Sequence, residues 1–298
     1  MENSPGTVLR SETARATRDD HVLLVGNPNV GKSALFGSLT GSYVTVSNYP
    51  GTTVEIARGN AAIAGRKRTV VDTPGANSFL PTTDDERVTR DLLLEREGGA
   101  VIAVGDAKNL HRTSLLALQL SEMEIPFVLA LNMMDEAERR GIAVDTGELG
   151  RALGVDVVPT IATRGHGVDR LRRAMSAPRV GEVRPEYAPD IERAVARLQP
   201  LLPQTAVSSR ALGLMVLAGD PALLDWIRDR TPEGTVTSIE AIRAATQSAF
   251  REPLAYLINR ARLSAAEEIA TRTSRRRAGV SAVGRFTTRL EQATTHPL

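Results

Sequence analysis

The stretch from Gly26 to Ser33 constrains the fold more than any other part of the sequence. It reads Gly-Asn-Pro-Asn-Val-Gly-Lys-Ser and fits G-x-x-x-x-G-K-[ST], the pattern of a phosphate-binding loop. The apolar run 21–25 before it predicts a buried strand, and a helix is expected to begin at Ser33. Such a loop turns its backbone N–H groups inward, where they and the helix N-terminus meet a polyphosphate. The alternative is a glycine-rich turn without a ligand, which the flanking strand and helix disfavour.

Two side chains of this loop carry chemistry of their own. Lys32 would reach the outer phosphates, and the Ser33 hydroxyl would be a magnesium ligand. Only Lys32, Lys67 and Lys108 are lysines among 37 basic residues, so an arginine-rich chain still has a compact point charge at this place. The residues expected to line the phosphate site are Gly26, Asn27, Pro28, Asn29, Val30, Gly31, Lys32, Ser33 and Ala34.

Composition excludes several classes of protein. A length of 298 residues suits two domains, and a net charge of +2 with 3% aromatic residues does not favour nucleic-acid binding. The absence of cysteine excludes disulfides and thiolate metal sites. No apolar run approaches the roughly 18 residues that span a bilayer. Residues 1–20 lack the apolar core of a signal peptide, and we expect them to form a disordered lead.

The alternation of apolar runs and helical patterns predicts an α/β fold. Strands are expected at 21–25, 54–64, 66–71, 100–104, 125–132 and 156–161, with a loop at 42–53. Strands separated by helices form βαβ units, so the sheet should be six-stranded and mostly parallel.

The pattern changes at Pro178, and the rest of the chain is helical in character. Helical stretches are expected at 191–201, 208–217, 221–230, 239–250 and 254–273. We therefore expect a nucleotide-binding domain at 21–178, an all-α domain at 179–273 and a basic tail at 274–298 that contains Arg275, Arg276 and Arg277.

A second motif, Asp72-Thr73-Pro74-Gly75, stands at the end of a predicted strand and fits D-x-x-G. The Asp72 carboxylate could hold magnesium through a water, and the Gly75 N–H could sense the γ-phosphate. The loop Gly51-Thr52-Thr53 precedes it, and the Thr53 hydroxyl could also bind magnesium, although a solvated hydroxyl is the simpler reading of Thr53 alone.

A third motif, Asn132-Met133-Met134-Asp135, predicts which base is bound. Asp135 could accept hydrogen bonds from N1–H and N2–H of guanine, which adenine does not offer, so discrimination should be large. Met133 and Met134 could line the base or be core residues. The loop Ile161-Ala162-Thr163 follows a strand, and its backbone N–H groups would meet guanine O6.

Together these residues resemble a known family. The segments 26–33, 48–55 and 129–137 are similar to the cytosolic GTPase region of FeoB, the bacterial ferrous-iron transporters, and residues 210–220 are similar to that family's helical domain. The resemblance implies a Ras-like P-loop GTPase followed by a helical domain that slows release of guanine nucleotide. It further implies that this chain, itself soluble, is part of a transporter on the cytoplasmic face of the cell membrane.

The resemblance also assigns roles. Asn29 aligns with the asparagine that holds potassium against the phosphates, and Ala76 stands where other GTPases have a water-orienting glutamine. Slow, potassium-stimulated hydrolysis is therefore expected, with GTP or GDP, Mg²⁺ and K⁺ as ligands. The expected catalytic residues are Asn29, Lys32, Thr53 and Gly75; the expected metal ligands are Ser33, Thr53 and Asp72 for Mg²⁺ and Asn29 for K⁺.

Three positions depart from the family pattern. Ile161 replaces a serine, which should weaken nucleotide binding; Asn77 replaces an aromatic residue, which should alter movement of the D-x-x-G segment; and Thr73 replaces a leucine. The partners that the resemblance implies are guanine nucleotide, the transporter's own transmembrane domain, small accessory iron-transport proteins and a second copy of the chain. Two other functions stay open: an RNA-associated assembly GTPase, and a nucleotide-controlled switch without useful hydrolysis.

Overall fold

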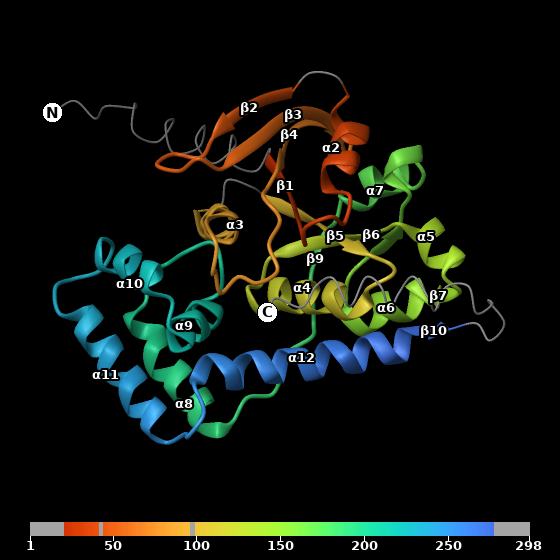
Figure 1. Ribbon diagram of the computed structural model, residues 1–298. Coiled ribbons are helices and arrows are strands. Elements are labelled where there is room, and N and C mark those ends of the chain that lie inside the picture. The colour runs from red at the N-terminus through yellow and green to blue at the C-terminus, as the bar shows by residue number, and fades with distance from the viewer. Residues whose placement is uncertain (1–20, 42–43, 96–98, 277–298) are drawn as a thin grey trace, which may run out of the picture.

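The computed structural model describes residues 21–41, 44–95 and 99–276. The N-terminal lead and residues 277–298 of the tail lie outside the described residues. One mixed sheet forms the centre of the molecule, with helices on both of its faces and a group of further helices to one side (Figure 1).

The central sheet has the strand order β2-β3-β4-β1-β5-β6-β8, and β9 pairs with β6. The pairs β1–β4, β1–β5, β5–β6 and β6–β8 are parallel, whereas β2–β3, β3–β4 and β6–β9 are antiparallel. The strands are β1 (His21–Gly26), β2 (Val44–Asn48), β3 (Glu55–Ile63), β4 (Arg66–Asp72), β5 (Ala100–Asp106), β6 (Pro126–Asn132), β8 (Val157–Pro159) and β9 (Arg179–Val180).

The mostly parallel sheet is confirmed, but it has eight strands in the described residues where the sequence predicts six. β2 occupies part of the expected loop 42–53, because Val44, Thr45 and Val46 suit a strand that pairs with β3 although all five of its residues are exposed. β9 is only two residues long and lies beyond the expected change at Pro178. It pairs with the part of β6 that the short β8 leaves uncovered.

Alternate residues of the inner strands face opposite sides of the sheet. Val22, Leu24 and Ile102 belong to one buried cluster, which the residues of helices α2 and α7 complete. Leu23, Val25 and many others belong to a second and larger cluster on the other face. The helices of the sheet domain are α2 (Lys32–Thr40), α3 (Asp84–Glu95), α4 (Leu110–Glu122), α5 (Met134–Arg139), α6 (Thr146–Leu153) and α7 (Val168–Ala174).

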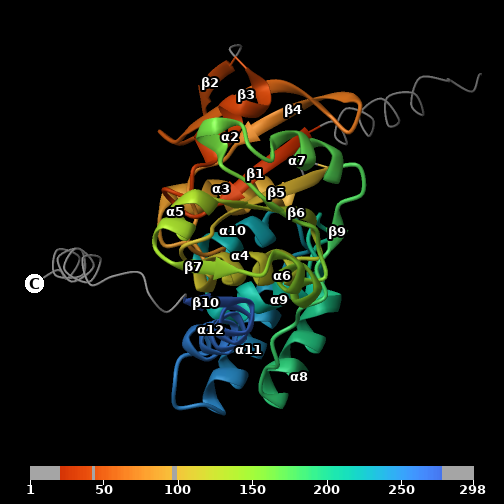
Figure 2. The same cartoon turned by 90° about the vertical axis from the view of Figure 1, so that its right-hand side faces the viewer.

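The remaining helices follow β9 and pack together, most of them below the sheet in the view of Figure 2. They are α8 (Pro189–Leu198), α9 (Ser209–Ala218), α10 (Pro221–Arg228), α11 (Thr235–Ser248) and α12 (Leu254–Thr273). Apolar residues recur at helical spacing on two of them: Leu212, Met215 and Val216 of α9 are buried, as are Leu254 and Ile258 of α12, whereas Leu257 is half-buried. In the described part of the chain, no helix is both long and apolar enough to cross a membrane.

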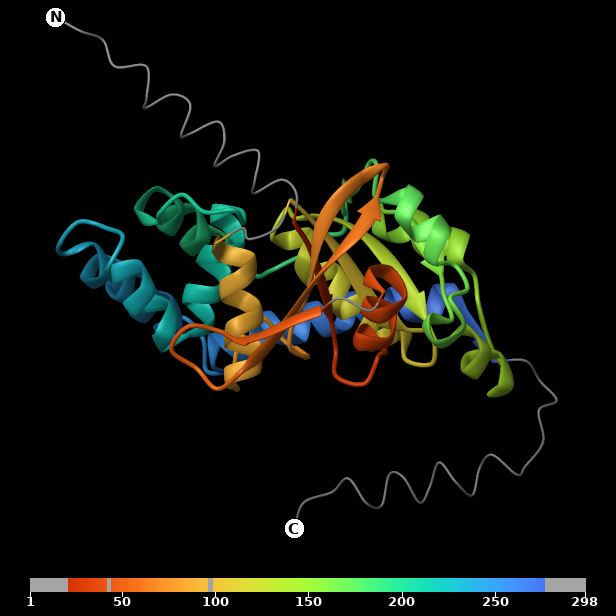
Figure 3. The ribbon, with the colours of Figure 1, turned by 90° about the horizontal axis from the view of Figure 1, so that it is seen from above.

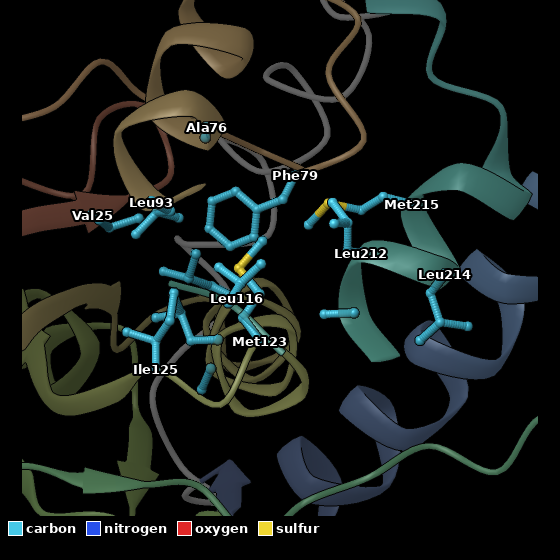
Figure 4. Packing of buried hydrophobic residues seen from close by; sticks show 14 of the residues in the cluster. Val25, Ala76, Phe79, Leu93, Leu116, Met123, Ile125, Leu212, Leu214 and Met215 are labelled. Carbon is cyan, nitrogen blue, oxygen red and sulfur yellow. The ribbon is translucent and has the colours of Figure 1, made fainter. Parts of the chain in front are cut away.

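These helices do not form a separate core. The larger buried cluster runs without interruption from the sheet through α4 to α9, α11 and α12. Phe79, four residues after Gly75, lies in this cluster and faces Leu116 of α4, Met123 just after α4, and Leu212 and Met215 of α9 (Figure 4). The segment after the D-x-x-G motif is therefore part of the packing between sheet and helices.

Buried polar contacts reinforce this junction. Arg90 of α3 pairs with Asp220, which caps α10 by accepting from the Leu223 N–H. Arg262 of α12 donates to Glu122 at the end of α4 over 2.7 Å. Arg90, Glu122 and Arg262 are each less than 5% exposed, so each charge depends on its partner.

A second, two-stranded sheet returns the chain to the sheet domain. β7 (Ile142–Val144) pairs antiparallel with β10 (Ser274–Arg276), and the Asp145 N–H donates to the Thr273 carbonyl over 2.9 Å. The start of the expected tail is therefore a strand, and Arg275 and Arg276 belong to it.

Candidate nucleotide-binding site

The phosphate loop connects β1 to α2 in the geometry that its sequence predicts. Gly31 has φ of +87°, in the left-handed region that favours glycine. A Cβ atom there would lie 2.4 Å from Nδ2 of Asn132, so no side chain fits. Gly31 thereby lets the base motif at the end of β6 touch the phosphate loop.

Lys32 is buried at the first turn of α2. Its Nζ donates to the carbonyl oxygens of Gly26 and Asn27, each over 3.2 Å, and so closes the loop on itself. Burial lowers the pKa of Lys32 below its ordinary value, and the nearby carboxylates of Asp72 and Asp85 partly oppose that shift. A bound phosphate would give Lys32 a negatively charged partner in place of the two neutral loop carbonyls.

Asn29 lies at the exposed tip of the loop and has φ of +63°. Asparagine tolerates this left-handed conformation better than most residues, so the backbone gives a reason for Asn29 apart from ion binding. Pro28 is exposed beside it, while Val30 is buried against the sheet.

The Ser33 hydroxyl and the Asp72 carboxylate meet, as the two motifs predict. Ser33 Oγ donates to Asp72 Oδ2 over 2.9 Å, and Asp72 Oδ1 is buried without a hydrogen-bond partner. Burial raises the pKa of Asp72, while the bond from Ser33 and the charge of Lys32 oppose the rise. A hydroxyl beside a carboxylate with a free buried oxygen fits a magnesium ion, which prefers such oxygen ligands.

The end of the D-x-x-G motif and the two residues after it contact the phosphate loop. A Cβ on Gly75 would approach Pro28 to 2.9 Å, and the Ala76 N–H donates to the Gly26 carbonyl over 3.1 Å. Asn27 Nδ2 donates to the Ala76 carbonyl over 3.1 Å and to Asn77 Oδ1 over 3.4 Å. Asn77, one of the three departures, thus contacts the phosphate loop directly.

Thr73, another departure, has a structural explanation. It is buried, and its hydroxyl donates to the Leu24 carbonyl over 2.8 Å and to the Pro74 carbonyl over 3.2 Å. These bonds hold the turn at Pro74 against β1. A leucine at this position could hold the turn only by apolar packing.

The loop with Gly51, Thr52 and Thr53 is not brought into the site. It closes on itself, since the Thr52 hydroxyl donates to the Tyr49 carbonyl over 3.0 Å, and Gly51 and Thr53 are exposed. Ala57 of β3 pairs with Asp72 of β4, so this loop, which precedes β3, lies at the same edge of the sheet, one strand from Asp72 and two strands from β1 (Figure 3). In the described residues no hydrogen bond joins Thr53 to Ser33 or Asp72, so magnesium binding by Thr53 stays a prediction.

The base motif continues from β6 into α5. Asn132 is buried, whereas Met133, with φ of +61°, and Met134 are half-buried. Asn132 Nδ2 donates to the Val30 carbonyl over 2.9 Å, and its Oδ1 accepts from the Thr160 hydroxyl over 3.2 Å and the Ala162 N–H over 2.9 Å. One amide therefore joins the phosphate, base and guanine loops.

Asp135 forms two ion pairs that were not predicted from the sequence. Its Oδ2 lies 3.4 Å from Nη2 of Arg139 and 3.9 Å from Nη2 of Arg164. Arg139 was detectable as the i+4 neighbour on a helix. Arg164 was not, because only the fold brings the guanine loop beside Asp135.

The guanine loop is tightly formed. Ile161 and His166 pair as an isolated bridge, and Ala162, which is buried, begins the short 3₁₀ turn Ala162–Arg164 that includes the exposed Thr163. The Ala162 N–H, the group expected to meet the base, donates to Asn132 in this structure. A base would have to share or displace that bond.

Comparison with known proteins decides the family. Residues 20–175 match the family model described as ferrous iron transport protein B, and residues 187–275 match that of the FeoB cytosolic helical domain. The chain belongs to the FeoB family. The resemblance of the phosphate, base and helical segments is confirmed, and the all-α segment is the counterpart of FeoB's helical domain rather than of an RNA-binding domain.

Known FeoB sequences and structures agree with this. The chain is 37% identical over 205 residues to the Fe(2+) transporter FeoB of Escherichia coli K12, a match that covers 66% of this chain and 26% of the relative. It thus spans about a quarter of the length of the curated relatives it matches.

Solved FeoB structures cover more of the chain. The cytosolic domain of L. pneumophila FeoB superposes with a TM-score of 0.75 at 29% identity, covering 86% of this chain and 99% of that one. A mutant S. thermophilus NFeoB bound to GDP has a TM-score of 0.74 at 29% identity, over 86% and 99% of the two chains. The T. maritima domain in its GMPPNP form has a TM-score of 0.69 at 27% identity, with the same coverage.

The buried Asp72 charge gives a prediction about the unliganded protein. Because the folded state raises the pKa of Asp72 above its ordinary 3.8, it holds the proton more tightly than the unfolded chain does. The stability this provides is complete below 3.8 and is lost as pH rises through the raised pKa. Asp72→Asn, which keeps an acceptor for Ser33, should therefore increase the free energy of unfolding at pH 7.

Urea denaturation of both proteins without nucleotide or magnesium, from pH 4 to pH 7, checks this. The advantage of Asp72→Asn should shrink as the pH falls towards 4. A variant that is less stable than the parent at pH 7 would show that the Ser33 and Lys32 contacts outweigh burial of the charge.

Proposed function

We propose that this chain is the GTP-binding and slowly GTP-hydrolysing part of a ferrous-iron transporter, whose nucleotide state controls iron passage. The observation that carries the proposal is the Asn132 side chain, which ties the phosphate loop to the base and guanine loops. Three motifs far apart in sequence are thereby linked at one edge of the sheet, which supports the proposal that they bind one nucleotide together.

The charges of the site support phosphoryl transfer to water. Lys32 and the inward N–H groups of the loop would hold the outer phosphates, and Ser33 and Asp72 would hold the magnesium ion between them. Magnesium would neutralise charge on the phosphate oxygens. Gly75, whose backbone lies against Pro28, would donate its N–H to the γ-phosphate and so report whether GTP or GDP is bound.

Potassium stimulation and the larger assembly are also part of the proposal. Ala76 is buried and has no group to orient water, so hydrolysis lacks that aid, and a K⁺ ion with Asn29 at the loop tip as its candidate ligand would help by stabilising the charge that develops on the phosphate. A transmembrane domain outside this chain, small accessory proteins and a second copy are the proposed partners, at the cytoplasmic face of the membrane. A switch that binds but does not turn over is separated from this proposal by measuring phosphate release.

Base specificity tests the site at Asp135. Asp135→Asn should weaken GTP binding by about 2–3 kcal/mol, because a carboxylate that accepts from two guanine N–H groups becomes an amide that mismatches one of them. Titration with a fluorescent GTP analogue measures this. The variant should in turn favour xanthine nucleotide, whose 2-oxo group accepts from the new amide.

Equal affinity of the parent protein for ATP and GTP would contradict guanine recognition by Asp135. Asp156→Asn is the control, since Asp156 is an exposed aspartate that pairs with Arg179 at the surface. It should leave the preference between guanine and xanthine nucleotides unchanged.

Potassium should accelerate GTP hydrolysis over sodium by about tenfold, equivalent to about 1.4 kcal/mol of barrier. Asn29→Gly should lose that difference, because glycine keeps the left-handed backbone at this position but removes the amide oxygen. Phosphate release at saturating GTP in each salt is the measurement. Asn29→Ala is less informative, since alanine would also strain the loop.

If the Asn29→Gly variant keeps the full response to potassium, Asn29 serves the backbone and the ion is bound elsewhere. If the parent hydrolyses GTP equally fast in both salts, monovalent-ion activation itself is wrong.

Modulation of GDP release by the helical segment can be tested at its buried ion pair. Asp220→Asn keeps the cap on Leu223 but leaves the buried Arg90 with only Asp91, so it should cost about 3 kcal/mol of folding free energy and loosen α10 from α3. GDP release should then be several-fold faster. Asp225→Asn is the control, on the same helix but in an exposed pair with Arg228.

Release is followed by chasing fluorescent GDP with unlabelled GDP, at a temperature where the variant is folded by circular dichroism. An unchanged release rate in a variant that is measurably less stable would make the helical segment a spacer rather than a regulator.

A further inference from the structure

We propose that Ser38, on α2, is a positioning residue for guanine recognition. The inference rests on the proposed function, because it concerns how the guanine loop is held in place for the base. Ser38 Oγ donates to the Ala162 carbonyl over 2.8 Å, a contact between residues 124 positions apart. No nucleotide-binding motif of the sequence includes Ser38.

Ala162 is held from both sides. Its N–H donates to Asn132 Oδ1 over 2.9 Å, and its carbonyl accepts from Ser38. The N–H is the group expected to meet guanine O6, so the bond to Asn132 is the one that competes with the base. The bond from Ser38 is made to the carbonyl of Ala162 and does not compete with the base, so this bond remains when nucleotide binds.

The backbone at Ser38 is itself held in place by a side chain of α7. Arg172 of α7 donates through Nη2 to the carbonyls of Ser38 and Leu39, over 3.1 and 3.2 Å, and Asp169 holds the same guanidinium over 2.7 Å. The last turn of α2 is thereby fixed to the helix that follows the guanine loop. Because α7 begins at Val168, a short distance after Ala162, the loop is bounded at both ends by fixed groups.

Helix α2 also carries the phosphate ligands at its other end. Ser38 follows Lys32 by six positions, about 9 Å along a helix. One short helix thus sets the position of the guanine loop relative to the phosphate loop. Ile161 contributes no hydroxyl to this loop where the resemblance expects a serine, and Ser38 supplies one from outside.

The contact predicts a defect in base binding that does not depend on Asp135. Ser38→Ala should release fluorescent GDP about three- to tenfold faster, the range that loss of one hydrogen bond gives. Ser38→Thr keeps the hydroxyl and should restore most of the parent rate. Thr40→Val is the matched control: it removes an α2 hydroxyl whose one bond among the described residues is to the Phe36 carbonyl of its own helix.

Inosine diphosphate separates the effect of Ser38 from that of Asp135. It has the 6-oxo group that Ala162 would meet but lacks the 2-amino group that Asp135 would bind, so Ser38→Ala should weaken GDP and IDP by the same factor. Asp135→Asn should instead reduce the preference of the site for GDP over IDP.

Stopped-flow displacement and equilibrium titration of the full chain give all of these numbers. A parent protein that binds no guanine nucleotide would overturn the proposed function. A parent that binds GDP, with a Ser38→Ala variant that releases it at the parent rate, would overturn only the role of Ser38. Equal acceleration by Thr40→Val would overturn it too, because the effect would then come from α2 as a whole.

Discussion

The binding site depends on one buried amide. The Asn132 side chain donates to the phosphate loop and accepts from Thr160 and Ala162, so it links the three loops that follow β1, β6 and β8. The carboxyl ends of these parallel strands meet at one edge of the sheet, where an open α/β sheet binds its ligands. Gly31 is required there as much for its lack of a side chain as for its backbone angle, since any Cβ would collide with Asn132. The phosphate motif and the base motif are therefore joined directly through the Asn132 side chain.

The helical segment is attached to the part of the site that should respond to the γ-phosphate. Gly75 lies against the phosphate loop, and Phe79, a few residues on, packs among α4 and α9. Helix α3 follows directly and holds α10 through Arg90 and Asp220. Displacement of Gly75 would consequently disturb packing that the helices share with the sheet. Because that core is continuous, removal of the helices would expose it, so single buried contacts are better probes of coupling than truncation.

The sequence allowed the mostly parallel sheet and the phosphate loop to be predicted, because each follows from local patterns and from the rule that strand ends converge. Ser33 and Asp72 were each expected to bind magnesium, but the hydrogen bond between them was not predicted. The sequence did not allow β2, β9 or β10 to be predicted. All residues of β2 are exposed, so it lacks the buried alternation that marks a strand, and β9 and β10 are too short for any period to appear. The Arg164–Asp135 and Ser38–Ala162 contacts were also hidden, since each joins residues that only the completed fold brings together. The Thr53 loop shows the reverse case: its motif is evident in sequence, but the loop is folded on itself beside the site.

The end of the helical segment returns to the base-binding side of the molecule. After α12 the chain pairs as β10 with β7, and β7 follows α5, the helix that starts immediately after Met133 and carries Asp135. Arg272 at the end of α12 adds an ion pair to Glu148 of α6 over 3.2 Å. Surface pairs contribute little individually, but the backbone ladder and the burial of Thr273 fix this junction. The last described strand, β10, is therefore joined through one short strand and one short helix to the loop that would hold the base.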